Sequence, residues 1–198
     1  MQSPTIPIRK SAGPENRHTV SVRRATSEDL GKLRGMASRL SQQTIYERFH
    51  APYPAVPDWM LSSVLNLDDR AGGSLVAVAG DEIVGHAMYV RSADGDEAEI
   101  AVVVEDGWQS QGIGKLLIRR LAIEAGRRGV KVFVGAAVGE NRRVLGLLRS
   151  VFSGVQTSIE DGSYLLRIPL RTLGQVAECT GQARIIRPRA PGELALAK

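Results

Sequence analysis

The sequence contains little of what a disulfide-bonded, metal-binding or membrane-spanning protein needs. The single cysteine, Cys179, cannot form an internal disulfide, which fits a reducing compartment, so we expect a cytoplasmic protein. The three histidines have no partners at metal-ligand spacing, so no metal site is expected. The longest apolar runs, such as Ile100–Val104, are strand-sized, whereas a membrane span needs about 20 residues. Residues 1–18 hold three prolines and no apolar stretch of signal-peptide length, so secretion is not expected.

A concentrated basic patch is also missing. The net charge is +5, of which +2 falls in residues 1–18 and +3 in residues 171–198, so residues 19–170 are neutral. Binding to a nucleic-acid backbone needs positive charge gathered on one surface. The sequence therefore predicts a flexible arm over 1–18, a neutral domain over 19–170 and a basic, mobile tail over 171–198, with no nucleic acid or membrane as partner.

Strand and helix patterns alternate through the neutral domain. A first strand is followed by helices and then by three strands, of which two are joined by the turn dipeptide Gly80-Asp81, typical of a tight hairpin. A helix with apolar residues at helical spacing begins after Gly114 and ends near Gly129. A strand, a helix over 141–152 and two more strands complete the order. This order predicts one domain, a mixed α/β sheet covered by helices.

The segment from Val103 to Lys115 is the most informative, because a strand enters a glycine-bearing turn that opens directly into a helix. Free N–H groups at such a helix start form an anion site, and glycine lets the backbone approach phosphate oxygens. A P-loop would need a Ser or Thr at Leu116 and a glycine at Gln109. A dinucleotide fingerprint would need a glycine at Leu117. Both fail, and a glycine turn that merely joins strand to helix is the remaining alternative.

The pattern that is present, Gln-x-x-Gly-x-Gly beginning at Gln109, resembles the acetyl-CoA pyrophosphate loop of the GNAT N-acetyltransferases. The resemblance extends over roughly Val20 to Leu170 through the order of elements. It implies a mostly antiparallel α+β sheet of about seven strands flanked by helices, with acetyl-CoA as cosubstrate. It also implies that the pyrophosphate is cradled by Gln109, Ser110, Gln111, Gly112, Ile113 and Gly114.

Glu99 lies on the strand before this loop and is the candidate general base. Transfer of acetyl to an amine requires the uncharged amine, and a lysine ammonium of pKa about 10.4 must lose a proton at a cost of roughly 4 kcal/mol at neutral pH. A carboxylate can remove that proton. Glu97 shares a strand face with Glu99 and is the fallback base, whereas the opposite face is apolar and is expected in the core. The alternative is that Glu99 is a solvated or ion-paired strand residue.

The string Ala98–Val104 is similar to the corresponding strand of bacterial Pat-type protein lysine acetyltransferases, in which the matching glutamate is the general base. The resemblance implies a protein lysine as acceptor. It also implies that the backbone of Ala101, Val102 and Val103 binds the pantetheine arm, with one N–H polarising the thioester carbonyl, and that Asn141 and Arg149 complete the coenzyme site. Asn141 is equally a helix N-cap candidate.

Several alternatives stay open. Many GNAT enzymes have a tyrosine on the later helix to protonate the leaving thiolate, and residues 141–152 have none. The acceptor could instead be a small amine such as an aminoglycoside or polyamine, or the chain could be a non-catalytic acyl-CoA sensor. Arg48 fits either an acidic acceptor or an ordinary ion pair, and His86 fits either the acceptor cleft or a structural position. Dimers are common among such proteins, so a homodimer remains an option.

Overall fold

The computed structural model describes residues 17–138, 141–160, 162–170 and 182–186. The α-helices in this part of the chain are α1 (Leu30–Ser38), α2 (Gln42–Phe49), α3 (Asp58–Leu65), α4 (Ile113–Arg127) and α5 (Arg142–Val151). The strands are β1 (Arg17–Arg24), β2 (Gly72–Ala79), β3 (Glu82–Arg91), β4 (Glu97–Val104), β5 (Val132–Val138), β6 (Gln156–Glu160), β7 (Ser163–Pro169) and β8 (Gln182–Ile186).

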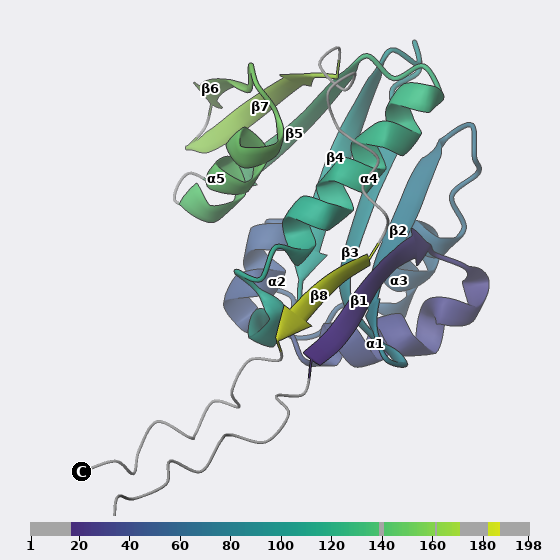
Figure 1. The fold of residues 1–198 in the computed structure, drawn as a ribbon. Coiled ribbons are helices and arrows are strands. Elements are labelled where there is room, and N and C mark those ends of the chain that lie inside the picture. The colour runs from purple at the N-terminus through teal and green to yellow at the C-terminus, as the bar shows by residue number, and fades with distance from the viewer. Residues whose placement is uncertain (1–16, 139–140, 161, 171–181, 187–198) are drawn as a thin grey trace, which may run out of the picture.

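All the strands form one twisted sheet in the order β6-β7-β5-β4-β3-β2-β1-β8 (Figure 1). Only β4 and β5 pair in parallel, and every other neighbouring pair is antiparallel, which confirms the expected mixed, mostly antiparallel sheet. The expected hairpin at Gly80-Asp81 is confirmed, since Ala79 pairs with Glu82 across it and Gly80 has φ +58°.

The sheet has one strand more than the expected seven, and that strand corrects the prediction for the C-terminal segment. Residues 182–186 form β8, which pairs antiparallel with β1, although the whole of 171–198 was expected to be a mobile tail. An unpaired β1 would leave its outer N–H and C=O groups without partners, and β8 supplies them. The other residues of 171–198, including Cys179, lie outside the described residues.

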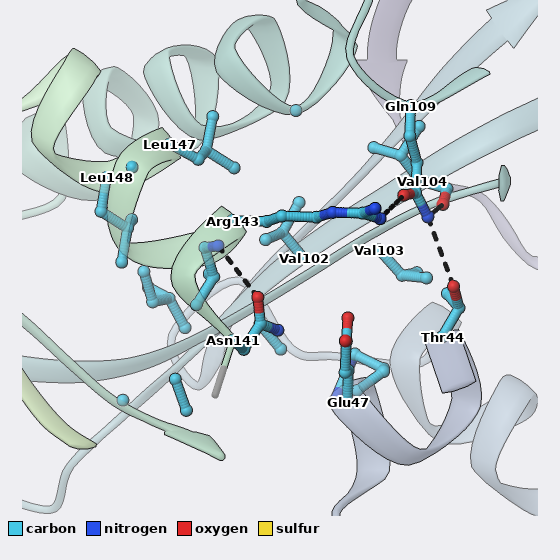
Figure 2. Close-up of a pocket in the computed structure, with 18 of the residues that line it drawn as sticks. Thr44, Glu47, Val102, Val103, Val104, Gln109, Asn141, Arg143, Leu147 and Leu148 are labelled. Atoms are coloured by element: carbon cyan, nitrogen blue, oxygen red, sulfur yellow. Dashed lines mark hydrogen bonds between the residues drawn. The ribbon is translucent and has the colours of Figure 1, made fainter. Parts of the chain in front are cut away.

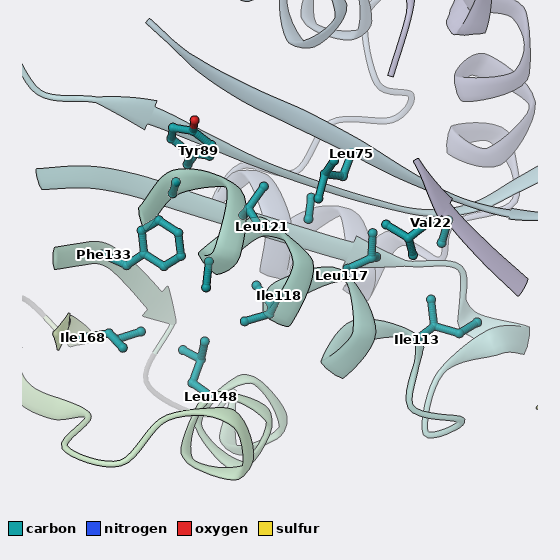
Figure 3. Close-up of a cluster of buried hydrophobic side chains, with 14 of the residues drawn as sticks. Val22, Leu75, Tyr89, Ile113, Leu117, Ile118, Leu121, Phe133, Leu148 and Ile168 are labelled. Carbon is teal, nitrogen blue, oxygen red and sulfur yellow. The ribbon is translucent and has the colours of Figure 1, made fainter. Parts of the chain in front are cut away.

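One face of the sheet is covered by α4 and α5 (Figures 1 and 3). The buried side of α4 packs on the sheet through residues three and four apart, as its sequence pattern predicts. Phe133 and Ile168 extend this cluster under α5, where Leu148 closes it (Figure 3). The buried α4 side chains are Ile113, Leu117, Ile118, Leu121, Ala122 and Ala125.

The other face carries a second core beneath α1, α2 and α3 (Figure 1). Leu33 and Met36 of α1, Ile45 of α2 and Leu61 of α3 pack there against sheet residues such as Val103. The opposite faces of β4 therefore enter different cores. Ile100, Val102 and Val104 pack on the α4 side, as the apolar alternation predicted.

The start of α2 is fixed to the turn that follows β4. The carboxylate of Asp106 accepts hydrogen bonds from the Ser41 N–H at 2.9 Å, from the Ser41 hydroxyl at 2.7 Å and from the Thr44 hydroxyl at 2.8 Å. Ser41 is also the N-cap of α2, and its hydroxyl accepts from the Thr44 N–H at 3.2 Å. These bonds hold α2 beside the strand-to-helix turn between β4 and α4.

Within the described residues, no helix combines the length and the apolar character that crossing a membrane requires.

Candidate active site

A cavity of about 730 Å³ opens where β4 and β5 separate. The parallel pairing of these strands is confined to Glu97–Glu99 against Val132–Val134. Beyond Glu99 the two strands diverge, and the opening is walled by β4, by β5, by the N-terminal end of α4, by α5 and by α2 (Figure 2). Glu99 itself stands at the fork and lines the cavity.

The hydrogen-bond register of β4 decides which backbone groups face the opening. Two bonds to the β3 side, from the Ser92 N–H to the Glu97 carbonyl and from the Glu105 N–H to the Val84 carbonyl, are both 2.9 Å long. Because hydrogen-bonded residues alternate along an antiparallel strand, the odd-numbered residues between them also pair with β3. The N–H and C=O groups of Ile100 and Val102 therefore point away from β3, toward the opening.

This register narrows the prediction for the pantetheine contacts. Ala101 and Val103 lie opposite Met88 and His86 of β3, and their backbone groups face that strand. Of the three residues predicted to bind through their backbone, only Val102 offers free groups to the cavity. Alternation alone could have shown that the backbone groups of neighbouring residues face opposite strands. It could not have shown whether the odd- or the even-numbered residues face the cavity.

The loop before α4 builds an anion site from its backbone. Ser110 and Gly112 adopt left-handed conformations, with φ of +62° and +85°, and α4 begins immediately afterwards. The first helical bond runs from the Leu116 N–H to the Gly112 carbonyl at 3.0 Å, so the N–H groups of residues 113–115 have no partner in the preceding turn. Ser110, Gly112 and Gly114 line the cavity. The residues present therefore fit the diphosphate of acetyl-CoA.

The side chains of the two glutamines are used inside the protein. The Gln109 amide donates to the Val104 carbonyl at 3.1 Å and to the Thr44 hydroxyl at 3.3 Å (Figure 2). The Gln111 amide donates to the Gly107 carbonyl at 3.1 Å, and Gln111 does not line the cavity. Ile113, only 1% exposed, is a core residue. The loop therefore has the expected strand-to-helix geometry, and the side-chain amides of its two glutamines hold its shape.

The wall formed by α5 includes one of the two residues that the resemblance implied for the coenzyme site. Asn141 does both things the sequence allowed, since its side chain caps α5 by accepting from the Val144 N–H at 3.0 Å and also lines the cavity (Figure 2). Arg149 is exposed and does not line the cavity, whereas Arg143 does. Arg143 donates to the Gln109 side-chain oxygen at 3.1 Å, which places its guanidinium beside the loop.

Helical periodicity could have found Arg143. Arg143 and Leu147 are one turn apart and both line the cavity, whereas Arg149, six residues after Arg143, lies about 240° around the helix. The sequence identified the helix correctly, but which of its faces meets the loop depends on how α5 packs against α4.

The far end of the cavity contains the charged side chains Glu47, Arg48 and Glu99. Glu99 is exposed, and no hydrogen bond or salt bridge holds its carboxylate among the described residues. Glu97, the fallback base, forms a salt bridge to Arg167 at 2.5 Å and does not line the cavity. Of the two strand carboxylates, the structure therefore leaves only Glu99 free to exchange a proton in the cavity. Glu47 is a further cavity carboxylate that the sequence did not single out.

His86 is structural. It is 4% exposed, its Nε2 lies 2.9 Å from the Ser74 hydroxyl, and it does not line the main cavity. Burial, aided by the positive charge of Arg48, lowers the pKa of His86 from 6.5 to about 3, so the ring is neutral at physiological pH.

This shift predicts an acid-sensitive fold. The unfolded chain protonates His86 near pH 6.5 and the folded chain only near pH 3, so stability is lost as pH falls below 6.5. We expect the free energy of unfolding to drop by about 2 kcal/mol from this residue between pH 7 and pH 5. His86→Gln, whose side-chain amide can still bond to the Ser74 hydroxyl, should not show this pH-dependent loss of stability. Urea denaturation of the wild type and the variant between pH 7 and pH 5 measures this loss. The same pH dependence of stability in both proteins would contradict the role of His86.

Two reactive side-chain types are missing from the described lining of the cavity. No tyrosine and no cysteine is among the described residues that line it. No group of three or more metal-ligating side chains occurs in the described part of the chain.

Comparison with known proteins agrees with this geometry. Residues 33–152 match the family described as the Acetyltransferase (GNAT) family. The acetyltransferase PA5475 of Pseudomonas aeruginosa is 26% identical over 132 residues, which cover 65% of this chain and 70% of that protein. The GNAT domain of S. lividans PAT is 27% identical with a TM-score of 0.70, covering 75% of this chain and 89% of that one.

A second solved structure is similar in fold. The spermidine N-acetyltransferase of Vibrio cholerae, solved with CoA and spermine, has a TM-score of 0.61 at 15% identity, and the match covers 78% of this chain and 97% of that one.

Proposed function

The chain belongs to the GNAT family of acetyltransferases and is an N-acetyltransferase that uses acetyl-CoA, and from this premise we propose that it acetylates protein lysine side chains with Glu99 as general base. The observation that carries the proposal is the free Glu99 carboxylate at the fork between β4 and β5. At this point the coenzyme groove meets the part of the cavity bordered by α2, where an acceptor can enter.

Each wall of the groove has a part in holding acetyl-CoA. The N–H groups at the start of α4 face the pyrophosphate, and Gly112 leaves room for its oxygens. The free N–H of Val102 is the donor that this register offers to the pantetheine arm or the thioester carbonyl. Ser110, Asn141 and Arg143 supply further polar groups around the same groove.

Direct transfer is the reaction these residues support. The amine nitrogen bonds to the thioester carbonyl carbon, the carbon–sulfur bond breaks, and CoA leaves as thiolate. Glu99 takes the proton that the amine loses. Since no cysteine or tyrosine is among the described cavity residues, we propose no acyl-enzyme and assign protonation of the thiolate to water.

A protein lysine is the favoured acceptor because the string Ala98–Val104 resembles the corresponding strand of Pat-type protein lysine acetyltransferases. The S. lividans PAT domain shares 27% identity, whereas the spermidine enzyme, at 15%, shares the fold alone. A small amine remains the second candidate acceptor, and a non-catalytic sensor of acetyl-CoA would be expected to tolerate the loss of Glu99.

Turnover should be measured by release of the CoA thiol, with lysine-bearing proteins and peptides in one panel and polyamines and aminoglycosides in another. We expect acetylation of protein lysines, located by mass spectrometry. Activity confined to the small amines would overturn the assigned acceptor, and binding of acetyl-CoA without any transfer would favour the sensor.

Two arginines on α5 allow a matched test of the coenzyme groove. Arg143→Ala should raise the Kd for acetyl-CoA roughly tenfold, because it removes a cation beside the pyrophosphate loop and a bond that shapes Gln109. Arg149→Ala, on the exposed side of the same helix, should change it less than about twofold. Calorimetric titration compares the two. Equal effects would contradict the placement of Arg143.

A further inference from the structure

Arg48 is a cavity residue whose guanidinium has only weak partners among the described residues. It is partly buried near the C-terminal end of α2, where its Nη2 donates to the Met88 sulfur at 3.6 Å and its Cζ lies 4.9 Å from the centre of the Phe49 ring. A thioether is a weak acceptor. No other hydrogen bond and no salt bridge engages Arg48 within the described residues, so its remaining N–H donors are unpaired.

The register of the sheet places this guanidinium close to Glu99. Met88 lies opposite Ala101 on β4, and Glu99 is two residues along the same face. Alternate residues on a strand are about 7 Å apart. The Arg48 guanidinium, which contacts Met88, therefore lies roughly 7 Å from Glu99 along the strand. Both side chains line the cavity, and no salt bridge between them is formed.

The electrostatic balance around Arg48 leaves its charge uncompensated. Burial lowers the pKa of the guanidinium, and the Glu99 carboxylate offsets only part of this effect. His86, behind it, is neutral and offers no countercharge. A partly buried cation with free donors is costly unless an anion or another acceptor reaches it. An acceptor that brought only an ammonium group would meet this charge unfavourably.

We propose that Arg48 selects acceptors that carry a carboxylate close in space to the reacting amine. The guanidinium binds the carboxylate through its planar pair of N–H groups while Glu99 faces the amine. In a protein, the carboxylate is an Asp or Glu side chain beside the target lysine. This inference rests on the proposed acetyl transfer and names the class of acceptor that the same cavity takes.

Matched acceptors test the selection in the wild-type protein. We would compare kcat/KM for lysine peptides that differ only in a Glu or a Gln beside the lysine, and for 6-aminohexanoate against hexylamine. The wild type should prefer the carboxylate peptide by at least about tenfold. Methyl esterification of that peptide should abolish the preference. A preference confined to the small-molecule pair would show that the carboxylate source is a free amino acid.

Variants of Arg48 link the preference to this residue. Arg48→Gln should lower kcat/KM for the carboxylate peptide about 30-fold, mainly through KM, and for the Gln peptide less than about threefold. Arg48→Lys, which keeps the positive charge but loses the planar pair of N–H groups, should retain part of the preference for the carboxylate peptide. Melting temperature and acetyl-CoA affinity are measured for each variant as controls for folding and for the coenzyme site.

The outcomes separate this inference from the function beneath it. If the wild type turned over both peptides without preferring the carboxylate, the role of Arg48 would be overturned. An equal loss of kcat/KM on both peptides in Arg48→Gln would overturn it as well. Neither result would affect the proposed acetyl transfer. Absence of turnover on every acceptor would overturn both. The wild-type comparison decides the matter even if the variants do not fold.

Discussion

Replacement of Glu99 by Gln should lower kcat for acetyl transfer by about 10²-fold or more at neutral pH while the affinity for acetyl-CoA stays unchanged. The carboxylate stands at the fork of β4 and β5, with no protein partner in the described residues, and Gln keeps its size but cannot accept the proton. The acceptor ammonium then has to lose its proton before it reaches the enzyme, which costs roughly 4 kcal/mol at pH 7.

The pH dependence of this loss makes the test specific. As pH rises toward the amine pKa of about 10.4, more acceptor arrives uncharged, so the gap between wild type and Glu99→Gln should narrow steadily. Glu97→Gln is the matched control on the same strand, since Glu97 is paired with Arg167 outside the cavity and its loss should leave turnover close to wild type.

A contrary result would also be informative. If Glu99→Gln kept its turnover within about threefold, the proton would have to leave through another group, and Glu47 is the other carboxylate that lines the cavity. A gap between the two proteins that did not change with pH would indicate that Glu99 positions the acceptor and does not take its proton.

The second large effect is expected at Gly112. Gly112→Ala should weaken acetyl-CoA binding by at least about tenfold, because a side chain at φ +85° is strained and because any relaxation moves the N–H groups at the start of α4. Apart from its neighbours in the chain, no protein atom lies within 4 Å of the position that the new Cβ would take. The added methyl group would stand in open space, so the expected loss of affinity comes from the strained backbone and not from a clash with the core.

Gly129, after the other end of α4, provides the control for strain. It has φ +89° and equally open surroundings, but it does not line the cavity. Both alanine variants should lose about 1–2 kcal/mol of stability, since both force a left-handed conformation on a residue with a side chain. Only the Gly112 variant should lose acetyl-CoA affinity. Calorimetric titration and thermal melts measure both quantities, and equal affinities in the two variants would refute the role of Gly112.

The site could be predicted from sequence to the extent that its chemistry is local. The glycine loop, the helix after it and the strand before it follow one another within Val103–Lys115, so residue types and short periodicities were sufficient. The position of Glu99 on the strand face opposite Ile100 and Val102 also followed from alternation alone. None of these inferences required knowledge of a distant segment.

The differences between the sequence expectations and the structure all depend on distant segments. Residues 182–186 are too short a stretch to be recognised as a strand by themselves, and they form β8 by pairing with β1. Arg149 and Arg143 are both basic residues of one helix, and the packing of α5 against α4 decides that Arg143 meets the loop. The pairing of Ala101 and Val103 with β3 likewise follows from the register between strands.

The sequence by itself indicated the order of elements over 19–170, the glycine loop and the carboxylate that precedes it, because these depend on neighbours within a few residues, and the resemblance to the GNAT enzymes pointed to acetyl-CoA. The tertiary structure decided that β4 and β5 diverge after Glu99, that Gln109 holds the loop and that Arg48 enters the cavity unpaired. Each of these results from contacts between residues far apart in the chain. Strand register and helix packing set such contacts, and no short stretch of sequence encodes them.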